Sequence, residues 1–179
     1  MTSVDKAAEI LKSGGVIAFP TETVFGIGAL LTKRQAIRRI FSLKNRPLNK
    51  PLQVLVANLE QAKKLGKFNK KALDLAEVSW PGPLTIVVYK KRIVPKLVTG
   101  GGKTVGLRIP DHKTILELLK KCGPIAATSA NISDEKPALT ATAVKKALPG
   151  IDYIIPGRVK TGKASKVVNA TKGFITLRP

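Results

Sequence analysis

Cysteine and histidine are almost absent from this sequence, with one residue of each among 179. The lone Cys122 excludes an internal disulfide, and Cys122 and His112 are too few to form a Cys/His cluster for structural zinc. Asp and Glu number only 11, and no pair is spaced for general acid–base work. This scarcity argues against glycosidases and carboxylate-rich two-metal sites. With five Phe, two Tyr and one Trp, a stacking platform for single-stranded bases is not expected.

Long hydrophobic runs are also absent. The longest, such as 83–89, are far shorter than the roughly 20 residues that a membrane helix needs. The first 15 residues read as an amphipathic helix and lack the apolar core of a signal peptide. We therefore expect a cytoplasmic protein that does not contact a membrane.

Positive charge is what the sequence has in excess. Lys and Arg number 32, which leaves a formal net charge of +21. Such an imbalance favours polyanionic partners such as RNA or nucleotides and raises the rate of encounter with them. A solvated basic surface that aids solubility is the alternative. Because the lysines are spread along the chain, we expect a basic face on a folded body.

The length and the pattern of apolar residues predict one domain, residues 1–179, of the α/β class. Short apolar runs alternate with segments of helical period, and no linker or repeat divides them. Several strands are joined by loops, which favours a twisted mixed sheet with flanking helices. The expected helices are 4–13, 33–43, one capped by Asn58, 69–78, 112–121 and 140–148, the last capped by Thr140. The expected strands are 16–20, 52–57, 84–89, 105–109, 125–128, 151–155 and 174–177.

Two stretches resemble a phosphate-binding P-loop, and both fail. Residues 101–104 read GGKT, but the position of the opening glycine is Leu97. Residues 157–163 hold both glycines and the lysine, but Ala164 follows, with no hydroxyl for Mg²⁺. We read both as lysine-rich loops, and we expect His112 to sit in a helix-capping turn.

Polar groups gather where predicted strands end, which is where α/β sheets bind ligands. Strand 16–20 runs into Thr21-Glu22-Thr23, and strand 125–128 runs into Thr128-Ser129-Ala130-Asn131. Ser129 and Asn131 are two apart, so they should lie on one side.

Basic side chains accompany these groups. Lys44 and Arg46 follow a basic helix and, in an extended segment, would also share one side. Arg108 ends strand 105–109, and Thr104 stands at its start. Together the groups predict a pocket for a ligand that bears phosphate and carboxylate.

The sequence resembles the YrdC-type threonylcarbamoyl-adenylate synthases from about Val4 to Arg178. The matching stretches are GGVIAFPTETVFGIGA, KNRPLNKPL, WPGPLTIVV, TVGLRIPDH and AATSANISDEKPALT, in the order and spacing of the family. The KxR and SxN signature of the family is present as Lys44, Arg46, Ser129 and Asn131. The resemblance is to the short, single-domain form.

The resemblance implies a twisted α/β sheet around a basic concave cleft, and a reaction of L-threonine, bicarbonate or CO₂, and ATP. The threonine amine captures CO₂, the resulting carbamate attacks the α-phosphorus, and pyrophosphate leaves. Mg²⁺ arrives with ATP. The product is the first intermediate of N6-threonylcarbamoyladenosine in tRNA, and a separate tRNA-threonylcarbamoyl transferase would use it. Binding of tRNA itself stays open.

The resemblance also assigns roles to individual residues. Lys44 and Arg46 are the expected catalytic pair. The expected ATP contacts are Arg46, Lys50, Thr104, Asn131, Thr140 and Arg178, with Lys44 also on the phosphates. The expected threonine contacts are Thr23, Arg108, Ser129 and Ser165.

Three positions depart from the usual family pattern. Phe25 stands where a tyrosine is frequent, Leu55 where many members have histidine, and Asn169 where an acid is common. These departures weaken the roles assigned to individual residues, above all the contacts to threonine, more than they weaken the resemblance to the family.

Two other functions stay open at this point. The first is a non-catalytic module of the same fold that binds tRNA or ribosomal RNA. The second is a carbamoyl-transferring domain like the one within hydrogenase-maturation proteins, which normally sits in a much larger chain.

Overall fold

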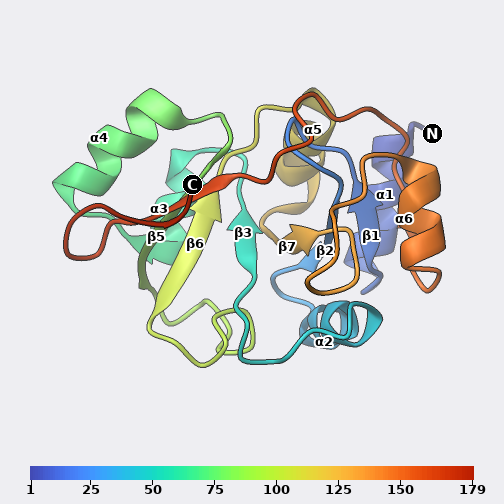
Figure 1. The fold of residues 1–179 in the computed structure, drawn as a ribbon, viewed down its shortest axis with the longest axis horizontal. Coiled ribbons are helices and arrows are strands. Elements are labelled where there is room, and N and C mark those ends of the chain that lie inside the picture. Colours follow the sequence, from blue (N-terminus) through green and yellow to red (C-terminus); the bar gives the residue numbers. More distant parts are fainter.

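A single mixed sheet organises the molecule in the computed structural model, which describes all 179 residues (Figure 1). The helices are α1 (Ser3–Lys12), α2 (Arg34–Leu43), α3 (Leu59–Leu65), α4 (Lys70–Ser79), α5 (Lys113–Cys122) and α6 (Ala141–Ala147). The strands are β1 (Ile17–Phe19), β2 (Gly26–Leu30), β3 (Gln53–Leu55), β4 (Gly66–Lys67), β5 (Leu84–Lys90), β6 (Thr104–Arg108), β7 (Ile125–Ser129), β8 (Tyr153–Ile154), β9 (Lys166–Asn169) and β10 (Ile175–Arg178). None of these helices is long and apolar enough to cross a membrane.

The sheet has the strand order β10-β9-β5-β6-β3-β7-β2-β1-β8, with β4 also paired to β5. Most neighbours are antiparallel, but β3 and β6, β5 and β9, and β1 and β8 run parallel. The prediction of a mixed sheet with helical cover is therefore confirmed.

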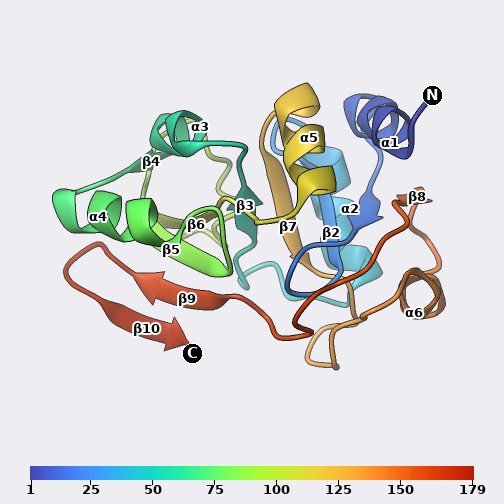
Figure 2. The ribbon, with the colours of Figure 1, turned by 90° about the horizontal axis from the view of Figure 1, so that it is seen from above.

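Two apolar clusters cover the two faces of the sheet. The larger, of 31 buried residues, includes the inner faces of α2, α3 and α4, and the smaller, of 15, includes those of α1 and α5. Neighbouring residues of β1 divide between them: Ala18 belongs to the larger cluster, and Ile17 and Phe19 belong to the smaller. Figure 2 shows α1 and α5 side by side over this second face. A strand buried on both faces has no polar alternation, which explains the continuous apolar run at β1.

The predicted helix caps are confirmed. Asn58 accepts a hydrogen bond from the Gln61 amide, and Thr140 accepts one from the Ala143 amide. His112 occupies the N-cap position of α5, but its side chain makes no capping hydrogen bond. The predicted helix-capping turn at His112 is therefore confirmed, and its N-cap position makes no use of the imidazole.

Strand β2 was not expected from the sequence, because Gly26 and Gly28 interrupt its apolar pattern. Close packing explains both glycines. A Cβ at Gly26 would lie 2.8 Å from Cε2 of Phe19, and one at Gly28 would lie 2.5 Å from Cγ2 of Ile125. Glycine is thus used inside this strand where neighbouring side chains lie against the backbone. The short β4 was not expected either.

The segment from residue 155 to residue 165 crosses the molecule. It leaves β8, which pairs with β1 at one end of the sheet, and enters β9, which pairs with β5 near the other end. Figure 2 shows this crossing as the long red connection that leads to β9. On the way, the amides of Lys160 and Thr161 donate to the carbonyl of Glu22 at 3.2 and 3.0 Å. These hydrogen bonds attach the crossing segment, which leads to the C-terminal hairpin, to the turn between β1 and β2.

Candidate active site

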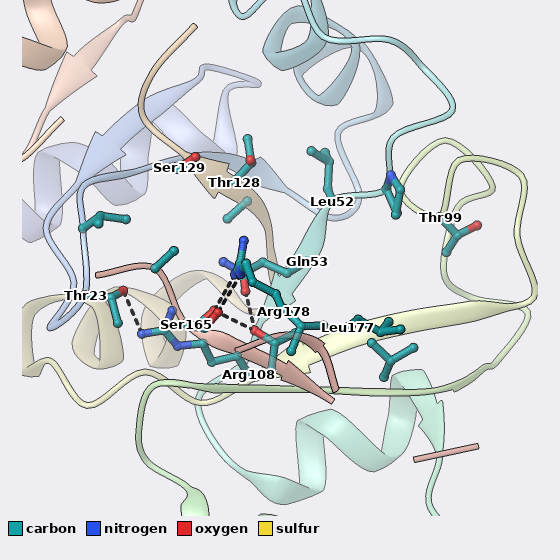
Figure 3. Close-up of a pocket in the computed structure, with 18 of the residues that line it drawn as sticks. Thr23, Leu52, Gln53, Thr99, Arg108, Thr128, Ser129, Ser165, Leu177 and Arg178 are labelled. Carbon is teal, nitrogen blue, oxygen red and sulfur yellow. Dashed lines mark hydrogen bonds between the residues drawn. The ribbon is translucent and has the colours of Figure 1, made fainter. Parts of the chain in front are cut away.

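The main pocket lies over the middle of the sheet and has a volume of about 290 Å³. Residues from β3, β5, β6, β7, β9 and β10 line it, together with the loop before β2 and the loop before β3 (Figure 3). Three arginines, Arg46, Arg108 and Arg178, are among the lining residues, and no Asp or Glu is. The charge of the wall therefore favours an anionic ligand.

The turn that leads into β2 is organised by the hydroxyl of Thr21. This oxygen accepts the amides of Thr23 and Val24 at 3.1 and 3.2 Å and donates to the Val24 carbonyl at 2.7 Å. Short hydroxyl side chains favour such turns, because they can bond to the backbone nearby. The turn holds the nearly buried Thr23 against the pocket.

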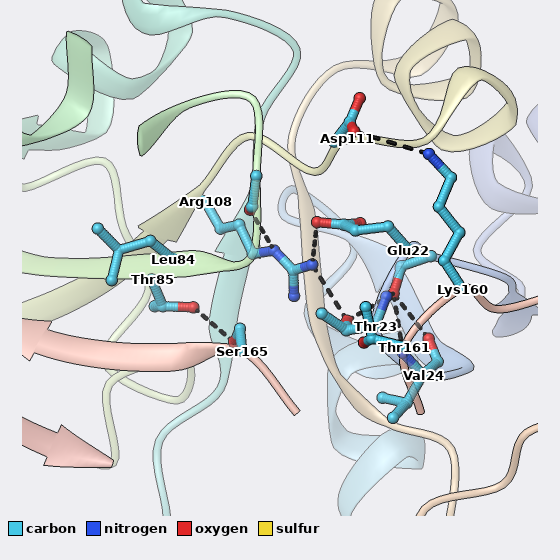
Figure 4. A network of polar contacts seen from close by, with 12 residues as sticks. Glu22, Thr23, Val24, Leu84, Thr85, Arg108, Asp111, Lys160, Thr161 and Ser165 are labelled. Carbon is cyan, nitrogen blue, oxygen red and sulfur yellow. Dashed lines mark hydrogen bonds and ion pairs between the residues drawn. The ribbon is translucent and has the colours of Figure 1, made fainter. Parts of the chain in front are cut away.

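Arg108 at the end of β6 is fixed from three directions (Figure 4). Its Nε donates to the Gly82 carbonyl at 3.1 Å, and its Nη2 donates to Glu22 Oε1 at 2.6 Å and to Thr23 Oγ1 at 3.1 Å. The side chains of Arg108 and Glu22 are only 2% and 4% exposed, so this ion pair is buried. Nη1 makes no hydrogen bond to the protein, which leaves one edge of the guanidinium for a ligand in the pocket.

The segment that holds Lys44 and Arg46 is a helix terminus, so the shared side that an extended segment would give these two residues is not found. Asn45 has a φ of 49°, in the left-handed region. The amide of Arg46 donates to the Phe41 carbonyl at 2.9 Å, and that of Asn45 to the Ser42 carbonyl at 3.3 Å. This is the Schellman arrangement, which often places Gly or Asn at the left-handed position. Consequently, Lys44 is buried while Arg46 lines the pocket.

Lys44 is 1% exposed, and its ammonium group has backbone acceptors only. Nζ donates to the Ser129 carbonyl at 2.6 Å and to the Asn131 carbonyl, and the Lys44 carbonyl accepts the amide of Ser133 at 2.9 Å. Burial, with a smaller contribution from the charge of Arg46, lowers the pKa of Lys44 to about 8. Lys44 therefore ties the end of α2 to the loop that follows β7.

That loop contains the second half of the signature. Ser129 ends β7 and lines the pocket. Asn131 is buried, and its amide nitrogen donates to the carbonyls of Ile132 and Glu135, both at 2.7 Å. Its Oδ1 is buried without a partner. Ser129 thus faces the pocket while Asn131 shapes the loop, so the expectation that both share one side is not met.

A polar chain crosses the opposite wall of the pocket. Arg178 Nη2 donates to Ser165 Oγ at 3.1 Å, Ser165 Oγ lies 3.1 Å from Thr85 Oγ1, and Thr85 Oγ1 donates to Gln53 Oε1 at 2.8 Å. Burial, and to a lesser degree the charge of Arg108, lowers the pKa of Arg178. Arg178 and Ser165 come from the C-terminal hairpin and the crossing segment.

The structure brings most of the predicted site residues to one pocket. Those that line it are Thr23, Arg46, Thr104, Arg108, Ser129, Ser165 and Arg178. Four others do not line it. Lys44 and Asn131 lie buried behind it, the exposed Thr140 caps α6, and Lys50 pairs with Asp134 at 2.9 Å. Their predicted contacts with ATP stay predictions.

Sequence reasoning missed several residues that build the site. Glu22 was noted only as part of a polar turn, but it neutralises the buried Arg108. Gln53 and Thr85 lie inside apolar strands, where a lone polar residue is the one local signal that could have drawn attention to them. Of the family departures, Phe25 and Leu55 are buried in the core, and Asn169 accepts the amide of Thr171 at 3.0 Å.

Comparisons with known proteins agree with this geometry. The model of the Sua5/YciO/YrdC family, described as telomere recombination, matches residues 9–179. The threonylcarbamoyl-AMP synthase of Hahella chejuensis is 34% identical, and the match covers 96% of both chains. The chain belongs to this family.

A longer relative and a solved structure show how far the match extends. The threonylcarbamoyl-AMP synthase of Pyrococcus abyssi is 41% identical over 97% of the chain, which spans about half (52%) of that longer relative. The crystal structure of P. abyssi Sua5 complexed with L-threonine has a TM-score of 0.94 and 39% identity, and the match covers 98% of this chain and 53% of that one. The YrdC-like sheet and the family resemblance are therefore confirmed, and the family is one of threonylcarbamoyl-AMP synthases.

Proposed function

We propose that the chain, acting as one domain over residues 1–179, joins L-threonine, bicarbonate and ATP into threonylcarbamoyl-AMP and pyrophosphate. The observation that carries the proposal is the pocket itself, in which three arginines and several hydroxyl groups converge without a carboxylate. A wall of this kind binds phosphate and carboxylate oxygens and supplies no general base of its own. The relatives of short and long form, which are threonylcarbamoyl-AMP synthases, support the same activity.

The reaction needs little from the protein beyond positioning and charge. The threonine amine adds to CO₂ derived from bicarbonate and gives a carbamate. A carbamate oxygen then attacks the α-phosphorus of ATP, and the bond to the pyrophosphate oxygen breaks. Holding the reactants in line and neutralising the phosphates are the contributions expected in such a transfer.

Threonine would bind at the end of the pocket where Arg108 lies. The free Nη1 of Arg108 can donate to the threonine carboxylate, while Thr23 and Ser129 supply polar groups beside it. Ser165 would contact the substrate from the crossing segment. P. abyssi Sua5, a relative of the same fold, is known in complex with L-threonine, which supports this role.

ATP, which carries Mg²⁺ into the site, would lie toward Arg46 and Arg178. Arg46 is held by the carbonyls of Lys50 and Pro51 at 3.3 and 2.8 Å, so its guanidinium is positioned before the nucleotide arrives. Thr104 lines the same pocket. The predicted ATP contacts of Lys50, Asn131 and Thr140 belong to the proposal as well. Lys44 would act by holding the loop after β7 through the carbonyls of Ser129 and Asn131.

Steady-state kinetics of pyrophosphate release test these roles. Arg108→Gln should raise the KM for threonine about tenfold or more, because it removes a charge-assisted hydrogen bond, and Arg46→Gln should do the same for ATP. Arg92→Gln is the matched control, since Arg92 is exposed outside the pocket. If both pocket variants raised the KM values of all three substrates equally, the separate placement of threonine at Arg108 and ATP at Arg46 would be wrong.

The product would pass to a separate transferase in the cytoplasm, which places the threonylcarbamoyl group on a tRNA adenosine. Full modification of a tRNA by this protein alone, assayed by nucleoside mass spectrometry, would contradict that hand-over.

A further inference from the structure

The direction of the hydrogen bonds along the pocket wall identifies a further ligand-binding group. The chain of contacts starts at the guanidinium of Arg178, which can only donate. Ser165 Oγ accepts from it at 3.1 Å. At the other end, Thr85 Oγ1 donates its single proton to Gln53 Oε1 at 2.8 Å. The contact of 3.1 Å between Ser165 and Thr85 must then use the proton of Ser165.

This polarity decides what each residue offers to a ligand. The hydroxyl protons of Ser165 and Thr85 are both donated to other protein groups, so neither hydroxyl can donate a hydrogen bond to a substrate. The Oε1 of Gln53 is turned to Thr85, so its amide nitrogen points away from that contact. This nitrogen carries two N–H groups and makes no hydrogen bond to the protein.

The residues next to Gln53 in the sheet have small side chains or none, so they leave space above its amide group. Its neighbours across the sheet are Gly106 of β6 and Ala127 of β7. A Cβ at Gly106 would come within 2.9 Å of Thr85 Cγ2. Gln53 also lines the smaller cavity that continues toward Thr23 and Arg108. Figure 3 shows Gln53 among the labelled residues that line the pocket, near Ser165 and Arg178.

We infer that the Gln53 amide nitrogen is a substrate-binding donor, which binds a carboxylate-type oxygen of threonine or of bicarbonate and the carbamate formed from it. The inference rests on the proposed function and names one more group of the same site. The wall holds three arginines and no carboxylate, which favours an anionic oxygen in the pocket beside Gln53. Such an oxygen needs a hydrogen-bond donor, and the free amide nitrogen of Gln53 supplies one.

Two substitutions separate this role from a structural one. Gln53→Glu keeps an acceptor for Thr85 and places negative charge where the N–H donors were. Gln53→Met keeps the length of the side chain and removes both functions. If Gln53 binds an anion, the Glu variant is the weaker enzyme; if it only supports Thr85, the Met variant is.

The experiment measures KM for threonine and for bicarbonate in turn, with the other substrates saturating, in the wild type and both variants. We expect Gln53→Glu to raise one of these two KM values about tenfold or more, and Gln53→Met to raise the same one less. The KM for ATP should change less than about twofold. Whichever of the two KM values moves identifies the source of the oxygen.

Other outcomes would refute either the role of Gln53 or the proposed function on which it rests, and the experiment distinguishes these two cases. A Glu variant equal to the wild type, or a change in the KM for ATP alone, would refute the role of Gln53 and leave the proposed function intact. A wild type that forms no adduct would refute the proposed function itself. Thermal unfolding of both variants confirms that each is folded at the assay temperature.

Discussion

Arg108 and Glu22 show how a single ion pair can serve both the fold and the site. The pair is nearly inaccessible to water. Glu22 comes from the turn before β2 and Arg108 from the end of β6, 86 residues apart in the sequence. A buried charge is tolerated only where a partner neutralises it. Glu22 therefore holds the guanidinium in place, and the unused Nη1 faces the pocket.

Removal of the carboxylate should destabilise the protein strongly. We expect Glu22→Ala to lower the free energy of unfolding by about 3–5 kcal/mol, because it leaves Arg108 buried and unpaired. Glu22→Gln keeps an acceptor and should lower it less. The control is Glu60→Ala, which breaks an exposed pair with Lys63 and should change stability by less than about 1 kcal/mol. Urea denaturation of the three variants measures this, and a similar loss for Glu22 and Glu60 would contradict the account.

Lys44 predicts a pH dependence of stability. Burial lowers the pKa of Lys44 from 10.5 to about 8 in the folded protein. Between these two pH values the unfolded chain keeps a proton that the folded chain has lost. The unfolded state therefore binds more protons, and the contribution of Lys44 to the free energy of unfolding rises with pH in this window.

The slope should reach at most about 1.4 kcal/mol per pH unit. Lys44→Met, which has a similar length and no charge, should lack this contribution. The measurement is chemical denaturation of both proteins at a series of pH values from 7 to 10, the range around the pKa of Lys44 in the folded protein. Parallel curves for the two proteins would mean that Lys44 does not titrate as its burial implies.

At the scale of elements, the end of α2 governs where two signature residues point. The left-handed Asn45 closes the Schellman motif and separates the buried Lys44 from Arg46 in the pocket. Asn45→Gly should keep the stability and the KM for ATP, because glycine adopts this conformation freely. Asn45→Ala should lower the free energy of unfolding by about 1 kcal/mol and raise the KM for ATP. If the Ala and Gly variants behave alike in both assays, the turn does not position Arg46.

The sequence predicted most elements and the polar groups at strand ends, since these depend on local periods. It did not predict β2, because its glycines are required by the ring of Phe19 and the side chain of Ile125, which approach from the two strands that pair with it, β1 and β7. The spacing of Lys44 and Arg46 was misread for a similar reason. Two residues apart share a side only in an extended chain, and the helix terminus is not extended.

The site itself could be predicted only in part. Arg108 and Ser129 end β6 and β7 near the middle of the sheet, as α/β topology leads one to expect, and Thr23 lies in the turn between β1 and β2. Gln53 and Thr85 stand inside strands and become neighbours only through the pairing of β3, β6 and β5. Ser165 and Arg178 reach the pocket because β9 pairs with β5, and no local pattern announces that pairing.

At the scale of the whole molecule, a net charge of +21 suits the proposed function, whose product would be used on tRNA. The same charge is also compatible with RNA binding.

If the protein binds tRNA through this charge, we expect the affinity to fall steeply between roughly 50 and 200 mM salt, because binding through phosphates releases counterions. Adduct formation without tRNA should change much less. Filter binding and pyrophosphate release in one salt series measure both. RNA binding that does not depend on salt would contradict an electrostatic surface.

The most direct test of the central claim is mass spectrometry of the products formed from purified protein, MgATP, L-threonine and ¹³C-labelled bicarbonate. The account predicts threonylcarbamoyl-AMP that carries the label, and no such product when threonine, bicarbonate or ATP is omitted. If folded protein that binds ATP forms no labelled adduct, the pocket is not a synthase site, and RNA binding becomes the function to pursue.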